Sequence, residues 1–217
     1  MRTGLDLLEA GGSANLSLRK IATALDTGSA SLYVYVENLD HLKALMLDAA
    51  YGEITYRADL PPGERVEAAL KSLLDVLLRR RGLARIAAGS MPEGENWLRL
   101  NEFLLDGQLE AGVPPERAAW GIDLLLLQVT AKAAELTAWL DQGDVIARTE
   151  QVYAAAPAET FPRLHELHEL IFMGPGPRRF QWAVQALLCG IANTPLPSQS
   201  APPAHDKPPK HASDLGL

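Results

Sequence analysis

The chain has 217 residues, of which 47% are hydrophobic and 22% are charged, so it is long enough to bury a core without disulfides or metals. Its single cysteine excludes an internal disulfide framework and a cysteine-rich zinc module. A net charge of −7 argues against a protein that coats nucleic acid, although a local DNA-binding face remains compatible with it. No apolar run reaches the roughly 18 residues of a membrane span, and the first residues lack the apolar segment of a signal peptide. We therefore expect a cytoplasmic protein outside the membrane.

Short helices with recognisable start signals fill the first fifty residues. Apolar residues predict a helix over 5–10, and Ser17 is placed to cap a second helix. The turn 26–28 follows, where Gly28 tolerates a left-handed backbone. A third helix is predicted over 29–36, and Asn38 is placed to cap a fourth helix.

The rest of the chain also has helical periodicity, and no run of alternating β-branched residues predicts a sheet. Pro114 and Pro115 open the longest of these segments, because proline fits the first helical turn. The predicted helices cover residues 64–81, 95–111, 114–142, 145–155, 161–172 and 177–193. We therefore predict an all-α fold.

The composition divides the chain into three parts. Residues 1–53 hold the short helices, with a first helix that looks truncated, and residues 54–194 hold a larger helical domain. Residues 195–217 contain six prolines and almost no large apolar side chains, which predicts a disordered tail.

Residues 16–36 have the layout of a helix-turn-helix, in which the first helix braces and the second enters the DNA major groove. Spacing alone favours an ordinary helical corner. The polar residues favour DNA binding, because hydroxyls at a helix N-terminus donate to phosphate or base edges and arginine binds guanine or phosphate. These residues are Arg19, Lys20, Ser29, Ser31, Tyr33 and Tyr35.

Two stretches carry a family resemblance at opposite ends of the helical part. Residues 17–22 (SLRKIA) and 31–38 (SLYVYVEN), with Leu25 and Leu42, resemble the DNA-binding domain of the tetracycline-repressor (TetR) family. Residues 179–191 (RFQWAVQALLCGI) resemble the last core helix of the C-terminal domain of tetracycline repressors. The resemblance spans most of residues 1–194, although the middle matches only as helices.

The resemblance implies a homodimer that inserts two recognition helices into a near-palindromic double-stranded DNA operator. The implied DNA contacts are Ser17, Arg19, Ser29, Ala30, Ser31, Tyr33 and Tyr35. Leu32 and Val36 would belong to the core. The chain departs from the family at Tyr35, where a histidine is common, and at Leu39, where a lysine is common. The second departure removes one phosphate contact, so we expect modest affinity for DNA.

The resemblance also implies a pocket between the helices of the larger domain, which a small, largely apolar effector fills. Candidate lining residues are mainly large and apolar, with one amide: Trp97, Leu100, Phe103, Leu104, Leu124, Gln128 and Trp139. Core packing is the alternative for most of them, and Gln128 is equally compatible with a satisfied core amide. Ala87 aligns with a histidine that helps tetracycline repressors hold magnesium–tetracycline, so we do not expect that mode of binding. We predict no cofactor and no metal site.

The implied dimer face combines the end of the helix over 114–142 with the helix over 177–193, in a four-helix contact with a second copy. Small and apolar residues that allow close approach form this face: Trp182, Ala183, Ala186, Leu187 and Gly190. Internal packing of the same residues is the alternative.

Other chemistry is poorly supported by the sequence. His165 and His168 are three residues apart, whereas the helical zinc motif needs histidines four apart. Cys189 lies on an apolar helix side, which favours a buried, inert thiol. We therefore predict a DNA-binding transcriptional regulator, a repressor released by its effector, and not an enzyme. The alternative is a helical-bundle protein with no DNA role, either a small-molecule carrier or an enzyme.

Overall fold

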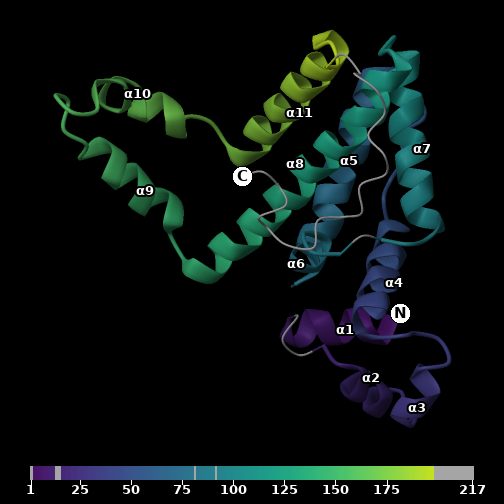
Figure 1. Ribbon diagram of the computed structural model, residues 1–217. Helices are drawn as coiled ribbons and strands as arrows, with labels where there is room; N and C mark the ends of the chain where they lie inside the picture. The colour runs from purple at the N-terminus through teal and green to yellow at the C-terminus, as the bar shows by residue number, and fades with distance from the viewer. Residues whose placement is uncertain (1, 13–15, 81, 91, 198–217) are drawn as a thin grey trace.

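The computed structural model describes residues 2–12, 16–80, 82–90 and 92–197, and all regular elements in these ranges are helices (Figure 1). The predicted all-α class is confirmed. Of the predicted tail, only residues 195–197 are described, and the remainder lies outside the described residues. None of the described helices is long and apolar enough to cross a bilayer.

The N-terminal unit consists of four helices, α1 (Arg2–Gly11), α2 (Leu18–Ala24), α3 (Ser29–Leu32) and α4 (Leu39–Tyr51). Both predicted caps are confirmed. The Ser17 hydroxyl accepts a hydrogen bond from the Lys20 backbone N–H at 3.2 Å, and the Asn38 side chain accepts one from the His41 N–H at 2.8 Å. Each cap satisfies an N–H group that has no partner within the helix, which fixes where α2 and α4 begin.

Two local predictions in this unit are wrong. The helix predicted over 29–36 ends at Leu32, whose carbonyl accepts hydrogen bonds from the Tyr35 and Val36 N–H groups in a tight turn. The left-handed residue of the preceding turn is Asp26, with φ of 51°, whereas Gly28 is extended at φ −74°. A short polar side chain tolerates this conformation, so the glycine is free to start α3.

Seven helices form the remainder of the described chain. They are α5 (Pro62–Arg79), α6 (Leu83–Ala87), α7 (Glu95–Glu110), α8 (Pro115–Gln142), α9 (Val145–Ala154), α10 (Pro162–Phe172) and α11 (Gly176–Asn193). α5 packs on α7 and α8, and α11 lies along α8 and α5 (Figure 1). The short helix α6 was not predicted from the sequence. We call α5–α8 with α11 the body.

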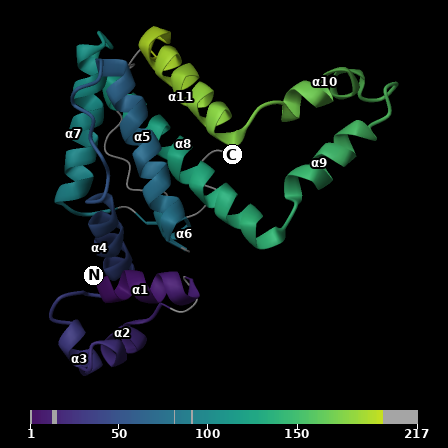
Figure 2. The same cartoon turned by 180° about the vertical axis from the view of Figure 1, so that it is seen from behind.

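The helices α9 and α10 form an arm that projects from the body between the end of α8 and the start of α11 (Figures 1 and 2). Neither helix contains a buried residue. The two helices pack mainly on each other, and the Tyr153 and Phe172 rings meet edge to face at 5.3 Å. Apolar side chains on the arm, such as Val152 and Leu170, are therefore exposed.

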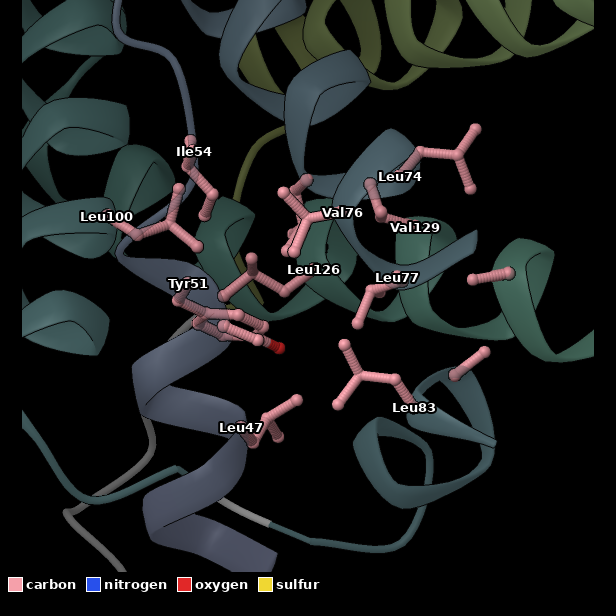
Figure 3. Close-up of a cluster of buried hydrophobic side chains, with 14 of the residues drawn as sticks. Leu47, Tyr51, Ile54, Leu74, Val76, Leu77, Leu83, Leu100, Leu126 and Val129 are labelled. Carbon is pink, nitrogen blue, oxygen red and sulfur yellow. The ribbon is translucent and has the colours of Figure 1, made fainter. Parts of the chain in front are cut away.

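One hydrophobic core runs through the body and into the N-terminal unit (Figure 3). Leu47 and Tyr51 of α4 meet Leu77 of α5 and Leu83 of α6 in this cluster. A fully buried leucine stabilises a fold by about 1.5–3 kcal/mol, so this core links α4 to the body with substantial energy. The sequence boundary at residue 53 therefore cuts across a continuous core.

We predict that Gly107→Ala destabilises the fold by about 1–3 kcal/mol through overpacking. A Cβ at Gly107 would lie 2.5 Å from Val66 Cγ2 and 3.2 Å from the Pro62 carbonyl oxygen, so α7 would have to move away from α5. Urea unfolding measures the loss. Gly63→Ala in α5 is the control, because nothing lies within 4 Å of its Cβ position. Equal stability of the two variants would contradict the close approach of α5 and α7.

Candidate nucleic-acid interface and effector site

The exposed surface of α2 and α3 lies at the end of the N-terminal unit that is farthest from the body (Figure 1). Arg19, Ala30 and Ser31 are exposed. Tyr33 is 59% exposed and Tyr35 is 76% exposed. Such high exposure is unusual for large aromatic side chains. This surface offers hydroxyls, one guanidinium and a small alanine to a partner.

The remaining predicted DNA contacts, Ser17 and Ser29, lie at the starts of α2 and α3. The Ser17 hydroxyl accepts from the backbone at the start of α2, and its proton is still available for a phosphate oxygen. Ser29 is the first residue of α3, and its side chain lies outside the described part of the chain. Val36 is buried and Leu32 packs partly against the core, as the sequence predicts.

The end of α4 is tied to the end of α5 by charge. Glu53 accepts hydrogen bonds from Arg80 at 2.6 and 3.1 Å and lies 3.6 Å from Arg79. The Arg80 hydrogen bonds hold the pKa of Glu53 below its usual value, and they raise the pKa of the Arg80 guanidinium. Asp6 and Glu9 of α1 add to the negative potential at Arg80, so the pair joins three helices.

The seven predicted effector-lining residues do not surround one described cavity. Leu100 and Leu104 are completely buried in the core. Trp97 is half-buried, with its ring 6.0 Å from that of Tyr51. Phe103 is half-buried on the other side of α7, where its ring lies 4.8 Å from that of Tyr56. These four α7 residues therefore face at least two different environments.

The three α8 candidates face outward from the body. Leu124 lines a cavity of about 400 Å³ between α8 and α11, with Trp120 and Ile191. Gln128 lines a wider groove of about 1090 Å³ between α8, α10 and α11. Trp139 is half-buried, and the Lys132 ammonium lies 4.9 Å from the centre of its ring. Neither of the two spaces lined by Leu124 and Gln128 includes an α7 candidate among its described lining residues.

Tyr51 is a buried polar residue that the sequence analysis missed. It is 2% exposed, and its ring reaches from α4 into the apolar cluster with Leu77 and Leu83 (Figure 3). The buried polar atoms that lack a hydrogen-bond partner among the described residues are instead the Tyr56 hydroxyl, Arg65 Nε and Gln108 Oε1. Burial, helped by the nearby charge of Asp48, raises the pKa of Tyr51 above its usual range, so the phenol stays protonated.

The predicted dimer residues lie along one side of α11. Trp182 is 71% exposed, Ala186 is exposed, and Ala183, Leu187 and Gly190 are half-buried. Trp120, Leu124 and Leu127 of α8 are exposed as well. Cys189 is exposed, so the prediction of a buried thiol is wrong. Large exposed apolar side chains on two adjacent helices are typical of a surface that a partner covers.

No group of three or more potential metal ligands is found among the described residues. The rings of His165 and His168 are 6.3 Å apart, and His168 Nδ1 lies 2.8 Å from the His165 carbonyl oxygen. Both contacts are local to α10 and do not indicate a metal site.

A helix-turn-helix joined through one helix to a larger helical body is the architecture of a one-component transcriptional regulator. A family model described as the tetracyclin repressor-like C-terminal domain matches residues 62–194. The chain therefore belongs to the TetR family of transcriptional regulators. The alternative of an enzyme is set aside by this assignment.

The relatives in the comparisons are also regulators. An HTH-type transcriptional regulator from Saccharopolyspora erythraea is 33% identical over 110 residues, and the match covers 50% of this chain and about half, 47%, of that protein. A putative transcription regulator from Streptomyces coelicolor is 36% identical, with a TM-score of 0.76 over 92% of this chain and 95% of that one. The TetR family protein ActR from Streptomyces coelicolor, solved in complex with actinorhodin, is 34% identical, with a TM-score of 0.79 over 88% of this chain and 93% of that one.

We predict that Glu53→Gln lowers the free energy of unfolding at about pH 7 by at most about 1 kcal/mol, because the pair is largely exposed. The folded-state pKa of Glu53 lies below its unfolded-state value. The stabilisation is therefore complete above the unfolded-state pKa and is lost as the pH falls through the folded-state pKa.

Urea unfolding at about pH 7 and about pH 3 measures this loss. The gap between wild type and Glu53→Gln should shrink at the lower pH. Glu102→Gln, which removes an exposed carboxylate from α7, is the control and should show no gap at either pH. A gap of the same size at both values would contradict the ion pair.

Proposed function

We propose that this protein is a homodimeric repressor that binds a palindromic DNA operator through α2 and α3 and leaves it when a small, largely apolar effector binds. The proposal assigns DNA binding to residues 1–53, effector binding and dimerisation to residues 54–194, and a Pro-rich tail to residues 195–217. The observation that carries it is the exposed surface of α2, α3 and the turn that follows α3, where Arg19, Ser31, Tyr33 and Tyr35 are exposed.

The proposed DNA contacts divide into two kinds. Arg19, Ala30 and Tyr33 would meet base edges in the major groove, because they lie on the exposed surface of α2, α3 and the following turn. Backbone phosphates would be met by Ser17, Ser29, Ser31 and Tyr35. Two copies joined along α8 and α11, through Trp182, Ala183, Ala186, Leu187 and Gly190, would present these surfaces to half-sites about one helical turn apart.

The proposed effector site centres on Tyr51 in the region between α4, α7 and α8. Tyr51 brings a protonated hydroxyl into the apolar cluster, and this hydroxyl would donate a hydrogen bond to an acceptor of an effector that enters there. Of the predicted lining residues, Trp97 has its ring 6.0 Å from that of Tyr51, and Leu100 belongs to the same buried cluster as Tyr51 (Figure 3). Phe103, Leu104, Leu124, Gln128 and Trp139 remain candidates with less support, because they point elsewhere or into closed core.

The effector class is proposed by analogy with ActR, which was solved with actinorhodin. Release from DNA requires that the effector bind the DNA-incompetent conformation more tightly than the competent one. A preference of 1–3 kcal/mol changes the affinity for DNA by roughly 5–150-fold.

We expect Arg19→Ala and Tyr33→Ala to weaken operator binding by at least about tenfold, since a good base contact is worth about 1–3 kcal/mol. Loss of a phosphate contact would also lower the salt slope by about 0.9. The operator is first selected from a random duplex pool with the wild-type protein. Fluorescence anisotropy at several salt concentrations then gives the affinities.

Arg85→Ala on α6 is the matched control, because it removes an exposed arginine far from α2 and α3. Thermal unfolding and dimerisation should be unchanged in all three variants. Unfolding of Arg19→Ala and Tyr33→Ala would show that these side chains are structural. Failure of the wild type to select any duplex would contradict the proposed DNA binding itself.

For the effector site we predict that Tyr51→Phe changes the free energy of unfolding by no more than about 1 kcal/mol, because the buried ring and its packing are kept. Actinorhodin is the probe, and its affinity should fall by about tenfold on loss of one hydrogen bond. Calorimetric titration and urea unfolding measure the two effects. Tyr153→Phe in the arm is the control. A large loss of stability in Tyr51→Phe would show that the hydroxyl has a structural partner.

A further inference from the structure

The helix α7 begins without a side-chain cap of its own. Its N-cap residue is Gly94, which provides no acceptor for the first N–H groups of the helix. An acceptor comes instead from α4. Asp48 Oδ1 accepts a hydrogen bond from the Trp97 backbone N–H at 2.8 Å, and Asp48 Oδ2 accepts one from the Asn96 side-chain amide at 3.2 Å. The first turn of α7 is therefore capped from a different helix.

This cap depends on close approach. A Cβ at Gly94 would lie 2.2 Å from Asp48 Cγ, so any side chain at Gly94 would push the carboxylate away. The backbone of Gly94 is extended, at φ −162°, which any residue adopts, so space and not strain requires the glycine. The Asn96 amide oxygen accepts in turn from Arg99 Nη1 at 3.2 Å, which holds the amide in place for Asp48.

The cap lies beside the proposed effector position. Asp48 precedes Tyr51 by one turn of α4, so both side chains lie on the same side of the helix. The Tyr51 ring lies 6.0 Å from the Trp97 ring, and it is the Trp97 N–H that Asp48 accepts. A hydrogen bond weakens steeply with distance and angle. A small displacement of α4 against α7 would therefore break the cap.

We propose that Asp48 is a positioning residue that holds the DNA-binding unit in one orientation by capping α7 from α4. α4 also carries Asn38 at its other end, directly after the recognition segment. Its angle to α7 thus sets where α2 and α3 lie relative to the body. The cap favours one angle, and an effector that separates Tyr51 from Trp97 favours another. This inference rests on the proposed function, because it assigns the contact through which effector binding reaches the DNA surface.

The experiment separates capping of α7 from coupling between the helices. Asp48→Ala removes both acceptors. Adding Gly94→Ser to Asp48→Ala supplies a local hydroxyl cap, since serine is a preferred N-cap residue and the carboxylate no longer occupies the space. Asp106→Ala removes an exposed carboxylate from α7 and is the matched control. The readouts are thermal unfolding, amide hydrogen exchange by mass spectrometry, and affinity for the duplex selected with the wild type.

We expect Asp48→Ala to bind the duplex at least about fivefold more weakly, and its Trp97 and α4 amides to exchange faster. The double variant should regain the melting temperature and the protection of the α7 amides. Its α4 amides should still exchange faster, and its affinity for DNA should stay low. Asp106→Ala should match the wild type in every readout.

Recovery of both DNA affinity and α4 protection in the double variant would overturn the proposal, since Asp48 would then serve α7 alone. Unchanged DNA affinity and exchange in Asp48→Ala would overturn it as well. If the wild type selects no duplex, the proposed function fails separately. The exchange of the α4 amides in the double variant then still decides whether Asp48 couples the two helices.

Discussion

The burial of the second half of α4 is the constraint on which the rest of the structure depends. Met46, Leu47, Ala50 and Tyr51 are at most 2% exposed, and they lie in the same core as α5, α6 and α8. The helix that leaves the recognition segment is therefore also a core helix of the body. Because packed cores shift between discrete arrangements and do not deform smoothly, a change in the body reaches α2 and α3 through this helix.

Polar contacts define the angle of α4 more sharply than apolar burial does. Asp48 on α4 caps α7, and Glu53, two residues after α4 ends, pairs with Arg80 at the end of α5, so two charged groups in and just after α4 bind two different helices. Apolar packing is non-directional, whereas hydrogen bonds have preferred distances and angles. The proposed DNA surface is held by few internal contacts. Tyr33 and Tyr35 are exposed. The Ser17 cap fixes the start of α2, and the buried side chain of Val36 anchors the turn after α3 to the core.

Capping residues and prolines in the sequence predict where individual helices begin. The caps at Ser17 and Asn38 and the proline that opens α8 were predictable, because each acts within one helical turn. Periodicity marks the apolar side of a helix but not the element that covers it, so Leu100 and Leu104 could not be told from pocket residues. The cap of Asp48 on α7 joins residues 49 positions apart, and nothing in the local sequence indicates it.

The central claim is that α4 belongs to the body's cooperative unit while it carries α2 and α3, the helices proposed to bind DNA. Native-state hydrogen exchange in increasing denaturant tests this claim most directly, because it assigns each amide to the unit with which it opens. The account predicts that the amides of Leu47 to Tyr51 open with those of α5 and α7, at the free energy of global unfolding. Opening of these amides together with α2 and α3, at a lower free energy, would contradict it.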